Sequence, residues 1–146
     1  NRHYIAGDGK PDQARRAIEA TSIRVDEAYG SDLLGEGAHV LYVGDFNMQS
    51  SNQDAFQTLL AAGAGQAHDP LNRLGSWSGN SSFADIHTQA PCQDDDGMGT
   101  GDSCNGLTAG GMDDRFDFQL MTSELLDGLE TVGLVESVAV LRSAIS

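Results

Sequence analysis

A carboxylate and a carboxamide stand two residues apart directly after an apolar run. The run occupies residues 39–43, and Asp45 and Asn47 follow it on either side of Phe46. On an extended backbone, residues i and i+2 point to the same side, so we expect the two polar groups to face one space. Such a pair suits a divalent cation with a phosphate oxygen, because the carboxylate binds the metal and the amide donates a hydrogen bond. The alternative is an Asp/Asn turn that only ends a strand.

The elements expected around this pair alternate between strand and helix. The run at 39–43 is short, apolar and β-branched, which favours a buried strand. Residues 2–6 predict another strand and residues 11–28 a helix with Pro11 in its first turn. The apolar stripe of that helix is predicted to consist of Ala14, Ile18, Thr21, Val25 and Ala28.

Residues 53–62 predict a second helix, with Phe56, Leu59 and Leu60 on its inner face. We expect one of Ser50, Ser51 and Asn52 to cap its start and Gly63 to follow its end.

The rest of the chain gives weaker signals. Residues 64–81 predict a loop anchored by Leu71, Leu74 and Trp77. Residues 82–89 and 116–121 alternate as strands do. Residues 125–134 look irregular, and residues 136–142 fit either a strand or a short helix. The chain has 146 residues and no linker, so we expect one α/β domain over residues 1–146.

The charge balance excludes some classes of protein. There are 22 acidic and 8 basic residues, giving a net charge of −14. We find no basic cluster that would bind a polyanion by charge alone. No apolar run approaches the roughly 20 residues that span a bilayer, so no membrane span is expected. Acidity of this degree favours solubility and divalent cations.

Two cysteines, Cys92 and Cys104, flank a polar, glycine-rich loop. A thiolate metal site would need more ligands nearby. A disulfide that closes the loop fits better, and it implies an oxidising, extracellular compartment. Two unpaired thiols are the alternative.

The loop between the cysteines is rich in aspartate. Asp94, Asp96 and Asp102, with glycines between them, predict a Ca²⁺ site. The spacing is not that of an EF-hand, and a solvated acidic loop is the alternative.

Four segments of the chain resemble motifs of the endonuclease/exonuclease/phosphatase superfamily, the deoxyribonuclease-like proteins, and they follow one another in the same order as in that superfamily. Gly44-Asp45-Phe46-Asn47 looks like the signature of that superfamily. Residues 3–7 and 113–118 are similar to two of its strands, and residues 69–89 look like its secreted bacterial branch. The resemblance spans residues 3 to about 127 and implies a four-layer α/β sandwich, present here only in part.

The resemblance also implies roles for single residues. His3, Asp45, Asn47 and Asp117 are the expected catalytic residues. The resemblance implies that His3 lies near the scissile phosphate and that Asp45 lies near a Mg²⁺ or Mn²⁺ ion and the attacking water. It implies that Asn47 binds a phosphate oxygen and that Asp117 orients a second histidine. The implied activity is metal-dependent hydrolysis of a phosphodiester, with nucleic acid as the expected substrate of a secreted nuclease.

Two further residues are candidates for substrate binding. Arg115 is either a phosphate clamp or a structural ion-pair partner, and His87 is either a cleft residue or a structural histidine.

Other parts of the superfamily's site have no counterpart here, namely an upstream Asn and Glu and a closing Ser-Asp-His. We therefore expect a partial domain whose apolar faces are covered by further residues, a second chain or self-association. The alternative to an enzyme is an extracellular structural, adhesion or self-assembling module that keeps the fold without the complete site.

Overall fold

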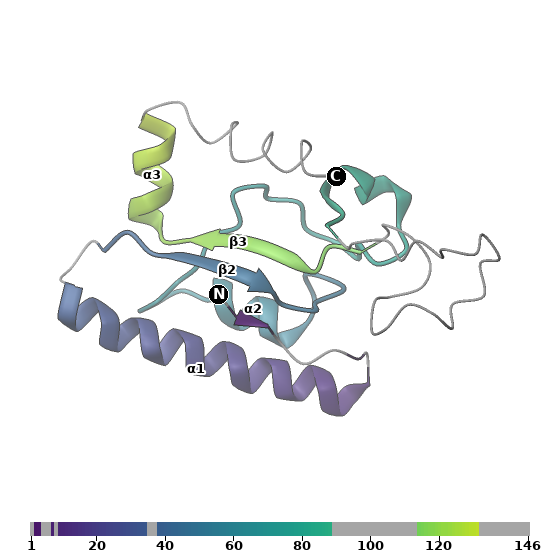
Figure 1. Ribbon diagram of the computed structural model, residues 1–146, viewed down its shortest axis with the longest axis horizontal. Helices are drawn as coiled ribbons and strands as arrows, with labels where there is room; N and C mark the ends of the chain where they lie inside the picture. The colour runs from purple at the N-terminus through teal and green to yellow at the C-terminus, as the bar shows by residue number, and fades with distance from the viewer. Residues whose placement is uncertain (1, 4–6, 8, 35–37, 89–113, 132–146) are drawn as a thin grey trace, which may run out of the picture.

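The computed structural model describes residues 2–3, 7, 9–34, 38–88 and 114–131 (Figure 1). A long helix lies along one side of a small sheet, and a short helix lies between them in the view of Figure 1. The fold is therefore mixed α/β at this level, as the alternation of predicted elements indicates.

Three strands form the sheet in the order β1-β2-β3. They are β1 (Arg2–His3), β2 (Leu41–Asp45) and β3 (Asp117–Met121). β1 is parallel to β2, and β3 is antiparallel to it. Helix α1 (Lys10–Leu34) makes the crossover from β1 to β2 that a parallel pair requires.

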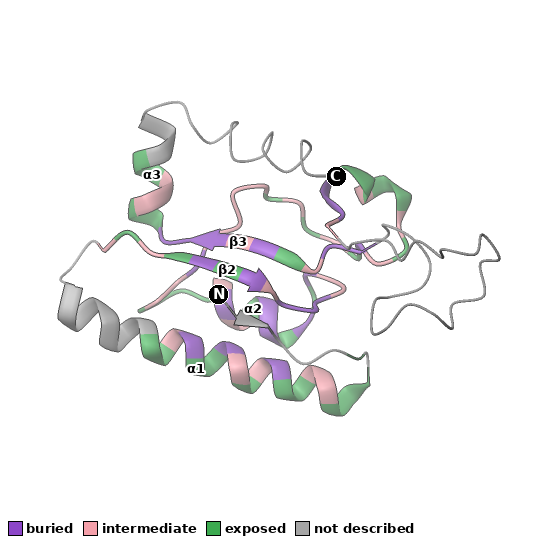
Figure 2. Cartoon of the chain, in the orientation of Figure 1, coloured by how far each residue is buried: buried purple, intermediate pink, exposed green. Residues whose placement is uncertain are grey.

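The two faces of the sheet differ in their surroundings (Figure 2). Tyr42, its partner Leu120 and Phe118 point to one face and are buried, because this face meets the helices. Leu41 and Val43 alternate with them on the other face, where they are 50% and 36% exposed. Asp45 continues the second set by the same alternation. The candidate carboxylate therefore belongs to the more open face of the sheet.

Helix α1 is longer than predicted and buries a different side. Pro11 does lie in its first turn. The expected stripe is wrong, since Ile18 is 67% and Val25 49% exposed. The residues buried along the helix are Arg16, Ala20 and Ile23, at steps of four and three. Hydrophobicity alone missed this side because its first member is an arginine.

Helix α2 (Asp54–Leu60) packs against α1 and contributes Phe56 and Leu59 to the core, as predicted. The predicted serine or asparagine cap is wrong, because Gln53 occupies the N-cap position and makes no side-chain cap bond. Ser51 instead accepts a hydrogen bond from the backbone N–H of Gly75 at 2.9 Å. Gly63 is not the residue that follows the helix, since the C-cap is Ala61.

The side chain of Arg24 provides hydrogen-bond donors for backbone carbonyls at the end of α2. Its guanidinium donates to the carbonyl oxygens of Thr58 at 2.9 Å and Ala61 at 2.6 Å. It also donates twice to the carbonyl of Ala64, at 3.2 and 2.6 Å. Carbonyls at the end of a helix have no partner within the helix, so this arginine caps α2 from α1.

Two predictions for the second half of the chain are wrong. Residues 81–86 form a 3₁₀ helix (Ser81–Ile86) and not a strand, and Asn80 caps it by accepting the N–H of Ser82 at 3.1 Å. Residues 125–134, predicted to be irregular, overlap with α3 (Ser123–Thr131). The predicted strand at 116–121 is confirmed as β3 with bounds one residue shorter. Residues 136–142 lie outside the described residues.

Four aromatic side chains fill the centre of the core. Phe46, Phe56, Trp77 and Phe118 contact one another with ring centroids 5.6–6.1 Å apart. Trp77 is fully buried, which confirms it as an anchor of the loop, whereas Leu74 is 58% exposed and does not anchor it. In the described part of the chain, no helix has both the length and the apolar character needed to cross a membrane.

Candidate functional site

The sheet register brings three of the predicted site residues into one row. His3 of β1 is the Cα partner of Asp45 in β2, and Asp45 is the partner of Asp117 in β3. Each strand therefore contributes one residue to the same line across the sheet. The positions are separated by up to 114 residues in sequence numbering, and only the pairing of the strands joins them.

Asn47 is held beside this row by a turn. Its backbone N–H donates to Oδ1 of Asp45 at 2.9 Å, and its φ of 48° is left-handed. Because β2 ends at Asp45, the extended-chain rule does not apply to this pair. The turn, our alternative interpretation, is what forms, and it still places the amide residue next to the carboxylate. Asn47 itself is buried, while Asp45 is partly exposed.

Backbone bonds fix the approach of Asp117 to Asp45. The N–H of Phe46 donates to the carbonyl of Phe116 at 2.8 Å, so the antiparallel pairing continues past the end of β2. The N–H of Asp117 points away from β2 and donates to Oγ1 of Thr88 at 2.9 Å. Asp45 and Asp117 are therefore a non-hydrogen-bonded pair, the kind in which side chains are closer.

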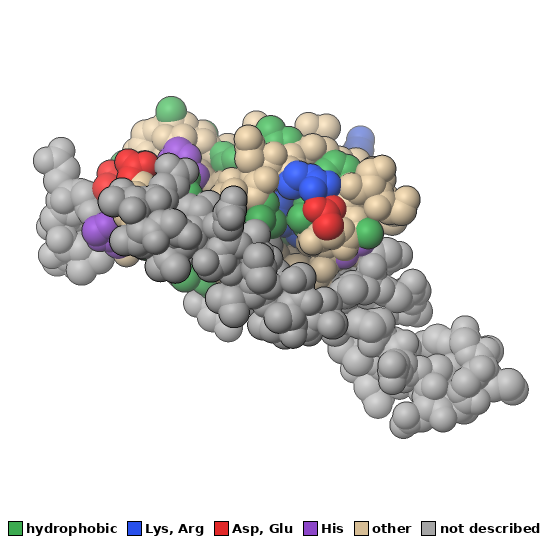
Figure 3. Space-filling model, turned by 90° about the horizontal axis from the view of Figure 1, so that it is seen from above, with side chains coloured by type: hydrophobic (Ala, Val, Ile, Leu, Met, Phe, Trp, Pro, Cys, Tyr) green, Lys and Arg blue, Asp and Glu red, His purple; other side chains and the backbone are tan. Residues whose placement is uncertain are grey.

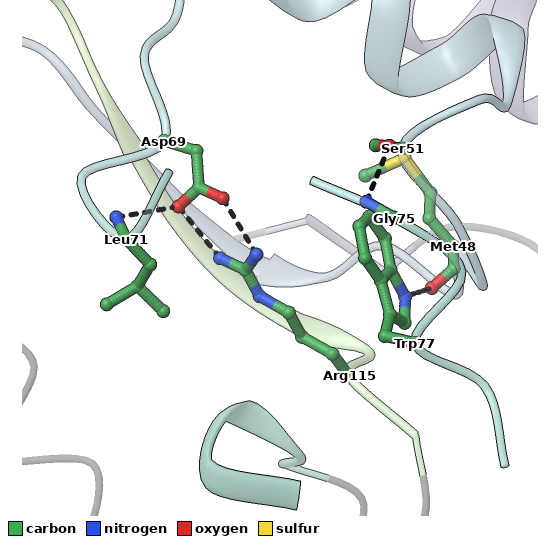
Figure 4. A network of polar contacts seen from close by, with 7 residues as sticks. All are labelled: Met48, Ser51, Asp69, Leu71, Gly75, Trp77 and Arg115. Carbon is green, nitrogen blue, oxygen red and sulfur yellow. Dashed lines mark hydrogen bonds and ion pairs between the residues drawn. The ribbon is translucent and has the colours of Figure 1, made fainter. Parts of the chain in front are cut away.

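Arg115 lies in the interior. Its guanidinium makes two hydrogen bonds to Asp69, at 2.7 and 2.8 Å (Figure 4). Both side chains are almost fully buried, with 0% and 2% exposure. The guanidinium also lies over the ring of Phe118, 4.2 Å from its centroid. Of our two interpretations, these contacts support the structural ion pair.

His87 also has a structural contact. It is buried, and its Nε2 lies 2.8 Å from the carbonyl oxygen of Trp77. A carbonyl only accepts, so Nε2 carries the proton in this bond. Trp77 in turn donates its indole N–H to the carbonyl of Met48 at 2.7 Å (Figure 4). His87 thus belongs to the support of the loop that follows Asn47.

A polar pocket of about 330 Å³ is lined by residues near the starts of α1 and α2, by the loop that follows Asn47 and by the loop before the 3₁₀ helix. Amide and hydroxyl side chains make up most of its wall, with one carboxylate. The residues that line it are Gln13, Gln49, Ser50, Asn52, Gln53, Asp54, Ser76 and Ser78. Sequence reasoning did not identify this pocket, because Ser76 and Ser78 reach it through a long loop that carries no periodic signal.

The far end of β3 carries a second group of charges, and Figure 3 shows histidine and acidic side chains gathered at one end of the surface. Glu124 lies in the first turn of α3, and the hydrogen bond from its own backbone N–H holds the pKa of its carboxyl below the usual value. The hydroxyl of Ser123 and the nearby His39 and His68 act in the same direction. This group lies at the opposite end of β3 from Asp117.

Several predicted site residues lie outside the described residues. These are Cys92, Cys104, Asp94, Asp96 and Asp102, which carry the disulfide and calcium predictions. Within the described ranges, no three or more His, Cys, Asp or Glu side chains are grouped closely enough to hold a metal ion. Asp45 and Asp117 are two oxygen donors of suitable chemistry, and the side chain of His3 is not described.

Comparison of the chain with protein-family models, with curated proteins and with solved structures found no match.

Proposed function

We propose that this protein is a metal-dependent phosphodiesterase, an extracellular nuclease with the deoxyribonuclease-like fold. The observation that carries the proposal is the row of His3, Asp45 and Asp117 across the sheet, with Asn47 bonded to Asp45. The spacing after the apolar run predicts Asp45 together with Asn47, and the resemblance adds His3 and Asp117. Their convergence on one edge of the sheet is what a shared site requires.

The residues of the row, with Asn47, can take separate roles in hydrolysis. Asp45 would hold a Mg²⁺ or Mn²⁺ ion, since magnesium sites in proteins use one or two carboxylates completed by water and substrate phosphate. That ion supplies a positive charge beside the phosphate. Asn47 would bind a phosphate oxygen through its amide. Asp117 would fix the orientation of a histidine, and His3 would hydrogen-bond near the scissile phosphate.

The four-layer α/β sandwich is part of the same proposal. A four-layer sandwich places a second sheet against the first, and the face bearing Leu41 and Val43 is available for it. Two half-exposed aliphatic side chains beside each other support a packing partner on that face. We propose that chain outside the described residues, or a second chain, covers it.

The test is an assay of the purified protein on DNA, RNA and bis(p-nitrophenyl) phosphate with Mg²⁺, Mn²⁺ or Ca²⁺. We expect hydrolysis that EDTA abolishes and Asp45→Ala removes. Asp127→Ala is the matched control, because Asp127 is an exposed acid of α3 at the other end of β3. Full activity of Asp45→Ala, or no hydrolysis by the wild type with any of the metals, would overturn the proposal and favour a structural module.

A further inference from the structure

The polar pocket near the starts of α1 and α2 has the chemistry of a site for a neutral, hydroxyl-rich ring. No lysine or arginine is among its described lining residues, and Asp54 adds a negative charge. An anionic phosphate is therefore disfavoured inside it. No aromatic ring is among those residues either, so the wall offers hydrogen bonds and not a stacking surface. Its volume of about 330 Å³ is at the lower end of the range for ligand pockets.

The pocket wall offers hydrogen-bonding groups that the rest of the described structure does not use. The side chains of Asn52, Asp54 and Ser78 make no hydrogen bond to another described residue. The same holds for the hydroxyls of Ser50 and Ser76. Together these groups provide both donors and acceptors, which is what several hydroxyls on one ring need.

The frame of the pocket is fixed and is joined to the candidate site. Ser50 and Ser76 form an isolated β-bridge across it. The carbonyl of Gln49 accepts the backbone N–H groups of Trp77 and Ser78, at 3.1 and 3.3 Å. Gln49 comes two residues after Asn47. One short loop therefore carries both the amide proposed to bind phosphate and a wall of the pocket.

We propose that this pocket binds the sugar ring of the nucleotide next to the hydrolysed phosphate. The inference rests on the proposed function, since the short loop that joins Asn47 to Gln49 of the wall is what identifies the ring as part of a nucleic acid. In RNA the ribose beside that phosphate keeps a free 2′-hydroxyl, and at a chain end a second hydroxyl, which match the amide and serine groups of the wall. The ring is neutral, so the acidic Asp54 does not oppose it.

Binding is tested first, and without hydrolysis. Methyl β-D-ribofuranoside is added to the ¹⁵N-labelled protein, and shifts of the backbone amides of Gln49, Asn52 and Ser78 are followed by NMR. We expect saturable shifts that Asn52→Leu and Ser78→Ala weaken by about three- to tenfold each, the cost of one lost hydrogen bond. Ser81→Ala is the matched control, because Ser81 is an exposed serine of the neighbouring 3₁₀ helix.

Steady-state kinetics then test whether the ring that binds in the pocket is part of the substrate. Asn52→Leu and Ser78→Ala should raise KM for an RNA dinucleotide and leave bis(p-nitrophenyl) phosphate unaffected, since that substrate has no sugar. The inference is overturned if the pocket amides do not shift with the riboside, or if they shift only with methyl α-D-glucopyranoside. Loss of hydrolysis in every assay with riboside binding intact would instead overturn the proposed function, so the two failures are distinguishable.

Discussion

Asp45 and Asp117 face each other directly across an antiparallel strand pair, in the register where no hydrogen bonds join the two residues. In such pairs the Cα atoms are about 4.5 Å apart and side chains are at their closest. Like charges opposite each other destabilise a sheet. The positive charge of the proposed Mg²⁺ or Mn²⁺ ion would offset this repulsion.

The carboxylate pair predicts a link between cation and stability. Asp117→Asn removes the repulsion, so in EDTA it should raise the free energy of unfolding by about 0.2–1 kcal/mol, and the melting temperature should rise with it. Millimolar Mg²⁺ should raise the melting temperature of the wild type and have less effect on the variant. Differential scanning calorimetry with and without metal checks this. A Mg²⁺ effect equal in both proteins would contradict it.

The buried ion pair predicts a large loss of stability. Asp69→Asn leaves the guanidinium of Arg115 buried without its counter-charge, and should cost about 3–5 kcal/mol in the free energy of unfolding. Urea denaturation measures the loss. Asp85→Asn is the matched control, because it breaks the Arg73–Asp85 pair, whose side chains are 38% and 59% exposed. That change should cost about 1 kcal/mol or less. Equal losses in the two variants would refute a structural role for Arg115.

The cap that Arg24 provides for α2 predicts a further loss. Arg24→Met keeps much of the side-chain volume but leaves the carbonyls of Thr58, Ala61 and Ala64 to water. We expect a loss of about 1–3 kcal/mol, the range for hydrogen bonds to a charged group. Arg15→Met, at an exposed position of the same helix, should change stability little. Hydrogen exchange of the α2 amides should accelerate only in the first variant, and protection unchanged there would contradict the role.

Glu124 predicts a dependence of stability on pH. Its pKa is lowered in the folded protein, first by the backbone N–H bond and then by Ser123. A lowered pKa stabilises the fold above the unfolded pKa, and the contribution is lost as pH falls through the folded pKa. The advantage of the wild type over Glu124→Gln should therefore shrink between about pH 6 and about pH 3. Paired urea titrations across that range check the sign, and an advantage that grows on acidification would contradict it.

The sequence predicted the elements whose signals are local. The apolar run before Asp45 and the alternation at 116–121 became paired strands, and Phe56 with Leu59 marked the inner face of α2. The buried face of α1 was missed because Arg16 replaces an apolar residue there, where its guanidinium bonds the carbonyl of Gly7 and the side chain of Gln53.

The site was predicted only as separate residues. Spacing suggested that Asp45 and Asn47 act together, but their contact arises from a turn and not from an extended strand. No local signal gives the register that sets Asp117 opposite Asp45, nor the pairing of Arg115 with Asp69, since both depend on contacts between distant segments. The pocket lined by Ser76 and Ser78 depends on such a contact as well.

The left-handed backbone of Asn47 limits how this position can be studied by mutagenesis. A residue there must adopt a φ of 48°, and the proposed role in phosphate binding also requires an amide. A β-branched or bulky replacement fails the first requirement before the second is tested, so an inactive Asn47→Val would report misfolding as readily as lost chemistry. Asn47→Gly and Asn47→Asp accept the conformation and change only the functional group. In a saturation library, those two variants carry the information about chemistry, and the others measure tolerance of the backbone.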